Sequence, residues 1–200
     1  MASCSGDKTV RFWDLFTETP LKTCEGHIHA VLIASWSPNG EYLATGDESG
    51  LIIIWDGKTC KQLSKCAGHK KFITGLSWEP LHKNVDSTRL ASSSKDATFR
   101  IWEVLIGRSE HVTTYHSACV TKVLWGGQDM IYTTSEDRTI KVWSNKGSLL
   151  KDLKSHAHWV NCISINTIYA LRTGCHDEKL TKYDTKEKMK EVALERYNKI

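Results

Sequence analysis

Residues 92–103 have the sequence SSSKDATFRIWE. Asp96 marks a turn, and after it polar and apolar residues alternate up to Trp102. Alternation with a period of two is typical of a half-buried β-strand, and a polar turn between two such runs is typical of antiparallel strands. The stretch therefore predicts two adjacent strands joined by a short turn.

The same pattern recurs along the whole chain at intervals of about 40 residues. An aromatic residue closes each strand-like run, and these residues are Trp13, Trp55, Trp102, Trp143 and Tyr183. Six positions earlier stands a turn residue, which is Asp7, Ser49, Asp96, Asp137 or Asp177. Ten positions earlier stands a hydroxyl residue, which is Ser3, Thr45, Ser92, Thr133 or Thr173. The chain is therefore an array of repeats.

Histidines keep the same period, at His27, His69, His116 and His156. A β-branched residue follows each of them by four positions, at Val31, Ile73, Val120 and Val160. Such residues favour strands, so each histidine is predicted to stand just before the first strand of a repeat.

Gly-His early in the repeat and Trp-Asp late in it resemble the WD40 family, whose repeats build four-stranded antiparallel blades of a β-propeller. The resemblance implies an all-β fold, a partial WD40 propeller over residues 1–184. Counting strands gives three complete blades between two partial blades of three strands, at residues 1–25, 29–66, 71–115, 118–154 and 158–184. The two partial blades overlap in two of their three strands and cannot merge into one four-stranded blade, so we expect a segment of a longer propeller.

Two segments depart from the repeat. The excess residues between Trp78 and Trp102 fall at 80–89, a polar and turn-rich stretch that predicts a longer surface loop. Residues 185–200 are rich in Lys and Glu, and their apolar residues follow a helical period. They predict a short C-terminal amphipathic helix, which either docks on the last blade or binds a partner.

The hydroxyl, histidine and aspartate of each repeat could also belong to a hydrolase triad. An active site needs one such constellation, whereas here the set recurs in successive repeats, and this favours a structural role. In WD40 blades the equivalent residues form a hydrogen-bonded tetrad. The resemblance implies that the aspartate accepts from the histidine, the histidine bonds the hydroxyl, and the hydroxyl meets the indole N–H of the tryptophan.

Two tetrads are expected to be complete: His69 with Ser92, Asp96 and Trp102, and His116 with Thr133, Asp137 and Trp143. In the set of His27, Thr45 and Trp55, Ser49 stands where aspartate is expected, and Asp47 could substitute only through a shifted turn. In the set of His156, Thr173 and Asp177, Tyr183 replaces the tryptophan. The set of Ser3, Asp7 and Trp13 has no histidine.

Other kinds of site find little support in the sequence. The pairs His27-x-His29 and His156-x-His158 lack the four convergent ligands of a closed zinc site, and no glycine-rich phosphate motif opens a helix. We therefore expect no catalytic residue, no metal and no cofactor. The net charge of +4 is too small to indicate nucleic acid by itself. Seven cysteines without a CxxC pair predict free thiols, and no apolar run is long enough to span a membrane.

Particular phrases resemble the Notchless family of eukaryotic WD40 proteins: ASCSGDKTVRFWD, GHKKFITGLSWEP, SSSKDA, KVLWGG, HAHWVN, LRTG and, beyond the repeats, ALERYNK. The resemblance implies a non-catalytic scaffold in assembly of the large (60S) ribosomal subunit. It implies a nuclear and nucleolar location, protein partners and pre-60S particles, with Notch signalling as a secondary role. The family's midasin-type AAA ATPase partner engages a ubiquitin-like domain that this sequence does not contain. The alternative is a generic WD40 adaptor, such as a ubiquitin-ligase substrate receptor.

Partner binding is expected on loops, which carry function on rigid scaffolds. The candidates lie two or three positions after a tetrad histidine or just before the turn aspartate, and they are His29, Lys71, Phe72, Lys95, His158 and Trp159. An incomplete propeller also leaves apolar sheet faces uncovered, so we expect the chain to self-associate.

Overall fold

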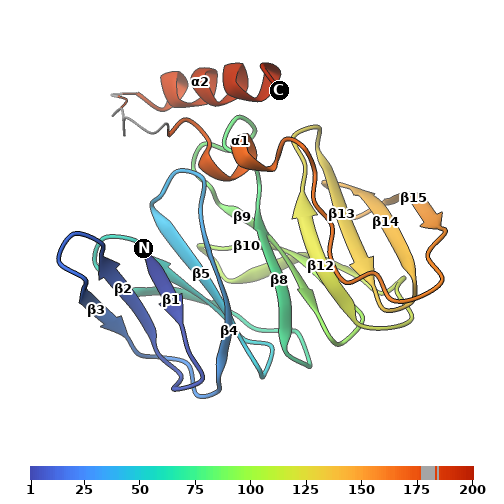
Figure 1. Cartoon of the computed structure of the whole chain (residues 1–200), viewed down its shortest axis with the longest axis horizontal. Helices are drawn as coiled ribbons and strands as arrows, with labels where there is room; N and C mark the ends of the chain where they lie inside the picture. Colours follow the sequence, from blue (N-terminus) through green and yellow to red (C-terminus); the bar gives the residue numbers. More distant parts are fainter. Residues whose placement is uncertain (177–182, 184) are drawn as a thin grey trace.

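A computed structural model describes residues 1–176, 183 and 185–200, and within them the chain forms four antiparallel sheets (Figure 1). The first sheet has three strands, β1 (Ala2–Cys4), β2 (Val10–Asp14) and β3 (Thr19–Cys24). The second contains β4 (Val31–Trp36), β5 (Tyr42–Asp47), β6 (Ile52–Asp56) and β7 (Gln62–Cys66). The third contains β8 (Ile73–Trp78), β9 (Arg89–Ser94), β10 (Phe99–Glu103) and β11 (Arg108–Thr113). The fourth contains β12 (Val120–Trp125), β13 (Met130–Ser135), β14 (Thr139–Ser144) and β15 (Leu149–Lys154).

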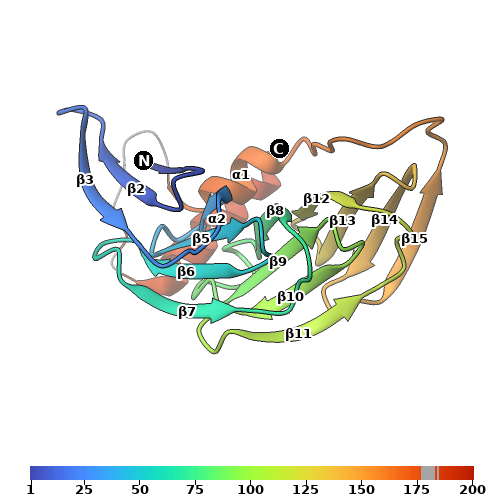
Figure 2. The ribbon, with the colours of Figure 1, turned by 90° about the horizontal axis from the view of Figure 1, so that it is seen from below.

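Each sheet is a meander in which consecutive strands are hydrogen-bonded neighbours. The sheets stand side by side in an arc, with β4, β8 and β12 in contact along its concave side and β7, β11 and β15 outermost (Figure 2). This is the architecture of a partial β-propeller. The fold class expected from the sequence is confirmed for the three complete four-stranded sheets.

The core lies between neighbouring sheets and explains why the repeat carries one tryptophan in its third strand. Trp55, Trp102 and Trp143 are almost fully buried. Trp143 packs with Phe99 and Ile101 of the sheet before it, so each tryptophan fills the gap between two sheets. Strand β6 is buried at four successive positions because sheets cover both of its faces, whereas the outer strand β15 is exposed throughout.

The partial blade expected over residues 158–184 is not found in the described residues. The backbone at Val160 is placed as predicted for the start of that blade, since the Val160 N–H donates to the Ser135 carbonyl over 3.1 Å. Residues 161–167 then belong to no sheet, and Ile168–Thr173 forms a short helix, α1, in place of the next strand. A helix satisfies its backbone hydrogen bonds within one segment, whereas a strand needs a neighbour. Residues 177–182 and 184 lie outside the described residues.

The C-terminal helix expected over residues 185–200 is present as α2 (Lys186–Asn198), and the Thr185 hydroxyl caps it by accepting from the Lys188 N–H. The expectation of an exposed loop at 80–89 is wrong in part, because Leu81, His82 and Ser87 are buried. Leu81 forms a small apolar cluster with Ala193 of α2 and with Cys175. The helix therefore docks on the β8–β9 loop, at the end of the sheets where α1 also lies (Figure 1).

One cysteine pair departs from the expectation of free thiols. A disulfide joins Cys24, at the end of β3, to Cys60, between β6 and β7, and so links the first sheet to the second. Four other cysteines are free thiols, and they are Cys4, Cys66, Cys119 and Cys162.

Candidate functional site

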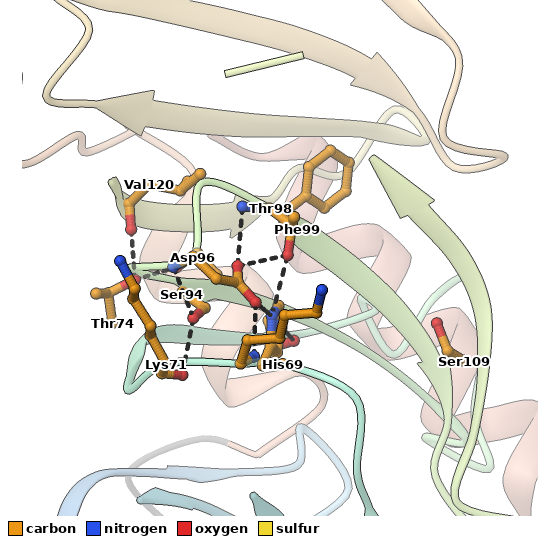
Figure 3. A network of polar contacts seen from close by, with 12 residues as sticks. His69, Lys71, Thr74, Ser94, Asp96, Thr98, Phe99, Ser109 and Val120 are labelled. Carbon is orange, nitrogen blue, oxygen red and sulfur yellow. Dashed lines mark hydrogen bonds and ion pairs between the residues drawn. The ribbon is translucent and has the colours of Figure 1, made fainter. Parts of the chain in front are cut away.

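The third sheet contains a complete tetrad, which hydrogen bonds hold between two strands and the loop before them. Figure 3 shows part of this network, in which His69 and Asp96 lie against each other. His69 Nδ1 lies 3.0 Å from Asp96 Oδ2, and its Nε2 lies 2.8 Å from Ser92 Oγ. The Trp102 indole N–H donates to the same Ser92 Oγ over 2.7 Å. If Nδ1 carries the proton, every polar atom of the set has a partner: the imidazole donates to the carboxylate, and the serine hydroxyl donates back to Nε2.

The fourth sheet repeats this geometry with threonine in place of serine. His116 Nδ1 lies 2.7 Å from Asp137 Oδ2, and its Nε2 lies 2.8 Å from Thr133 Oγ1. Trp143 Nε1 donates to Thr133 Oγ1 over 2.8 Å. The turn aspartate also accepts from the Thr139 backbone and hydroxyl, which fixes the turn between β13 and β14.

The second sheet forms its tetrad through the residue that the sequence left in doubt. His27 Nδ1 lies 2.8 Å from Asp47 Oδ2, while Thr45 Oγ1 bonds both His27 Nε2 and the Trp55 indole. Asp47 is the last residue of β5, two positions earlier than the aspartates of the other sheets. Ser49, at the expected position, donates its hydroxyl to Asp47 Oδ1 over 2.7 Å. The turn itself is not shifted, contrary to the expectation, because the Gly50 N–H donates to the Asp47 carbonyl just as the Arg138 N–H donates to the Ser135 carbonyl in the fourth sheet. The carboxylate reaches the histidine from the first residue of that turn.

The set expected around His156 is not assembled among the described residues. His156 is exposed, and Thr173 lies in α1, where its hydroxyl accepts from Arg196. Asp177 lies outside the described residues, and Tyr183 packs at the edge of the cluster beneath α2. The cause is the replacement of strands by a helix after residue 167.

Burial decides what the tetrads can do chemically. Thr45, Ser92 and Thr133 have no exposed surface, and each hydroxyl already serves a histidine and a tryptophan. Burial lowers the pKa of His116, and it would raise the pKa of Asp137, but hydrogen bonds from Thr139 and His116 outweigh that effect and lower it to about 2. A neutral imidazole beside an ionised carboxylate resembles a triad, yet its hydroxyl has no access for a substrate.

The residues expected to bind partners gather at the end of the arc opposite α1 and α2. We call this end the lower face; it carries the β3–β4, β7–β8, β11–β12, β9–β10 and β13–β14 connections. His29, Lys71 and Lys95 are exposed there. The Lys95 ammonium lies 5.0 Å from the centre of the half-buried Phe72 ring, and the Lys95 N–H donates to the Phe72 carbonyl over 3.0 Å.

The last two candidates follow β15, on the chain that leaves the fourth sheet. His158 and Trp159 are exposed, and their rings lie 5.1 Å apart. Trp159 keeps 54% of its surface in solvent. Sequence reasoning missed Tyr115, which is 67% exposed beside the tetrad histidine. Its signal was a tyrosine at the position where Gly26 and Gly68 precede their histidines.

The described residues contain no group of three or more His, Cys, Asp or Glu side chains that could hold a metal ion. In the same part of the chain, no helix has the length and apolar character needed to cross a membrane.

The repeated sheets and tetrads define a class of protein, and a family model agrees with it. The model for "WD domain, G-beta repeat" matches residues 1–14, 18–56, 60–103 and 107–144, so the chain belongs to the WD40 repeat family.

Curated relatives narrow the comparison. The chain is 45% identical over 207 residues to Protein Notchless of Drosophila melanogaster, covering 100% of this chain and 42% of that protein. It is 45% identical over 205 residues to Ribosome assembly protein 4 of Saccharomyces cerevisiae, covering 100% of this chain and 40% of the relative. It is 48% identical over 134 residues to the Notchless protein homolog of Arabidopsis thaliana, covering 66% of this chain and 28% of that protein. The chain thus spans about two fifths of the length of the first two relatives.

Proposed function

We propose that the chain is part of a non-catalytic scaffold in assembly of the large ribosomal subunit, acting in the nucleus and nucleolus on pre-60S particles. The observation that carries this proposal is the likeness over the whole chain to two proteins, one of which is named for ribosome assembly. The geometry agrees with a scaffold, because the hydroxyl, histidine and carboxylate groups that could serve catalysis are buried in repeated sets.

The lower face supports a binding role for the exposed residues. Lys95 presents positive charge beside the half-buried Phe72 ring, Lys71 is exposed, and Trp159 presents a large aromatic surface. Aromatic and cationic side chains on a rigid support are enriched where proteins bind partners. The tetrad of the third sheet holds the two loops that carry Lys71 and Lys95, because His69 and Asp96 tie these connections to the strands beneath.

The test is affinity purification of the tagged full-length protein that contains this chain, from nuclear extract, with identification of bound RNA and protein. Precursor RNA and proteins of the large subunit are expected. Recovery of ubiquitin-ligase subunits without ribosomal precursors would contradict the proposal and favour the alternative function, a substrate receptor of a ubiquitin ligase. A parallel purification of an unrelated WD40 protein, tagged in the same way, controls for nonspecific capture of abundant ribosomal material.

A further inference from the structure

The boundary between the first two sheets carries a covalent link. The disulfide joins Cys24, the last residue of β3, to Cys60, in the turn between β6 and β7, and Figure 2 shows β3 ending beside the start of β7. At the same place the Lys22 ammonium donates a hydrogen bond to the Lys58 carbonyl over 3.0 Å. The outer strand of the first sheet is thus held to one turn of the second.

The corresponding boundary between the second and third sheets has no such bond. Cys66 ends β7 as Cys24 ends β3, and Gly107 stands where Cys60 stands, five positions after the tryptophan of its sheet. The N–H groups of Cys60 and Gly107 close the same kind of turn, each donating to the carbonyl four positions earlier, over 2.9 and 3.0 Å. Cys66 is a free thiol. Neighbouring sheets therefore pack without a covalent link, and the disulfide is additional to the fold.

The two sulfurs of the bond differ in access. Cys24 is 3% exposed, whereas Cys60 is half-buried in a surface turn. Thiol–disulfide exchange begins when a thiolate attacks one sulfur of the bond, and its rate depends on access to that sulfur. Cys60 is therefore the sulfur that an incoming thiol can reach.

Free thiols accompany the bond in the described part of the chain, and they are Cys4, Cys66, Cys119 and Cys162. Free thiols persist in a reducing compartment. Disulfides that form in such a compartment are usually transient, and they act in catalysis or in redox sensing. A single disulfide among free thiols thus favours a bond that opens and closes over a permanent one.

We propose that Cys24 and Cys60 form a redox modification site, a disulfide that a dithiol reductant opens and that glutathione disulfide closes again. In the opening reaction, a thiolate of the reductant attacks the Cys60 sulfur, and the Cys24 sulfur leaves with the bonding electron pair and takes up a proton. The second thiol of the reductant then attacks the mixed disulfide and releases Cys60. The cysteine pair gains two electrons and two protons, and the reductant becomes a disulfide.

The closing reaction runs through the same accessible sulfur. The Cys60 thiolate attacks glutathione disulfide and releases one glutathione, and Cys24 then attacks the Cys60 sulfur and releases the second. The cysteine pair loses two electrons and two protons, which the two glutathione molecules carry away. The proposal is independent of a role in ribosome assembly.

The bond also fixes the connection between β3 and β4. Gly26 of this connection lies against the Trp55 ring, which a Cβ at that position would approach to 3.1 Å. His27 belongs to the tetrad of the second sheet. The segment from Cys24 to His27 is therefore held at both ends while the bond is closed. Opening the bond leaves the tetrad end and the pairing of β2 with β3 in place and loosens the other end.

The first experiment locates the bond in the full-length protein that contains this chain. The protein is equilibrated with glutathione disulfide or with excess dithiothreitol, its free thiols are blocked, and its tryptic peptides are identified by mass spectrometry. Cys24 lies in the peptide of residues 23–58 and Cys60 in that of residues 59–61. We expect the two peptides to be joined in glutathione disulfide and separate in dithiothreitol, reversibly, with the protein folded in both.

Three results would overturn the proposal. The two peptides could stay separate in glutathione disulfide, so that the pair does not form a bond. They could stay joined in the folded protein under excess dithiothreitol, so that the bond does not open. The protein could unfold on reduction, as circular dichroism would show, so that the bond is a permanent part of the fold.

The second experiment compares hydrogen exchange in the oxidised and reduced protein. We expect exchange at residues 19–27 to be about tenfold faster or more after reduction, because local opening is no longer restrained by the bond, and exchange at residues 73–103 to be unchanged. Equal exchange at residues 19–27 in the two states would show that the bond does not hold the connection.

Two variants make the comparison specific. Cys60→Gly removes the bond without misfit, since glycine readily takes the φ of +61° at this position, as Gly107 takes +72° in the equivalent turn. It should exchange like the reduced protein in both buffers. Cys66→Ala is the matched control at the end of the next outer strand, and it should keep the joined peptides and the difference between buffers. Joined peptides that disappear in Cys66→Ala, or a Cys60→Gly protein that still responds to the buffer, would assign the effect to other cysteines.

Discussion

The imidazole of His82 stacks on the phenol ring of Tyr197, with ring centres 4.9 Å apart and planes inclined by 20°. His82 belongs to the β8–β9 loop and Tyr197 to α2, the two segments that depart from the repeat. His82 Nε2 also bonds the Gly127 carbonyl over 2.9 Å, and Lys186 at the start of α2 pairs with Asp86 of the same loop. The loop insertion and the C-terminal helix are thus one packing unit.

Removing the Tyr197 ring should loosen that unit. We expect Tyr197→Ala to lower the free energy of unfolding by about 1–3 kcal/mol and to speed hydrogen exchange in α2, because the ring packs against both His82 and the backbone at Gly127. Leu194→Ala is the control, since Leu194 is an exposed residue of the same helix. Unchanged exchange in α2 of the Tyr197 variant would show that the stack does not hold the helix.

The tetrads should matter for stability. We expect His116→Ala and Asp137→Ala each to lower the free energy of unfolding by about 1–3 kcal/mol, because each leaves a buried partner without its hydrogen bond. Urea unfolding measures this, with Glu25→Ala at an exposed position as the control. If both tetrad variants keep the wild-type free energy of unfolding, the tetrads have no structural role.

The second sheet offers a sharper comparison between neighbouring residues. Asp47 bonds the buried His27, whereas Ser49 bonds only Asp47 with its side chain. We therefore expect Asp47→Ala to destabilise the chain more than Ser49→Ala, by at least about 1 kcal/mol. The reverse order in thermal or urea unfolding would show that the aspartate does not carry the tetrad.

Stability should also depend on pH through the buried histidines. Burial lowers the pKa values of His27, His69 and His116 below 6.5. As the pH falls through 6.5, the unfolded chain takes up protons that the folded chain does not, so the stability present above that pH declines. The contribution of Asp137 is lost only as the pH falls from 3.8 towards about 2. We expect a lower Tm at about pH 5.5 than at about pH 7.5, and an equal or higher one would contradict the buried, neutral state.

The repeat period predicted most of the fold, because every blade uses the same strand alternation, the same turn and the same tryptophan. It also placed the tetrads of the third and fourth sheets, where the aspartate keeps its position relative to Trp102 and Trp143. It left Asp47 open because the sequence does not show that a carboxylate at the first residue of the turn reaches the same histidine as one placed two residues later.

The departures are tertiary effects. The repeat period of residues 158–184 predicts strands. A strand without a neighbour leaves its backbone hydrogen-bonding groups unpaired, and the helix α1 forms at Ile168–Thr173 instead. Similarly, the polarity of residues 80–89 predicted an exposed loop, whereas α2 covers Leu81 and His82. The contact of Cys24 with Cys60 joins positions 36 residues apart on neighbouring sheets, a distance over which no local pattern gives a signal.

Co-sedimentation with large-subunit precursors shows whether the scaffold binds through its lower face. The full-length protein that contains this chain would carry Lys95→Glu with Trp159→Ala, or the control Lys146→Glu, an exposed lysine in the β14–β15 turn. We predict that the double variant leaves the precursor fractions while the control remains, with equal thermal stability for both. Wild-type co-sedimentation of the double variant would contradict the account.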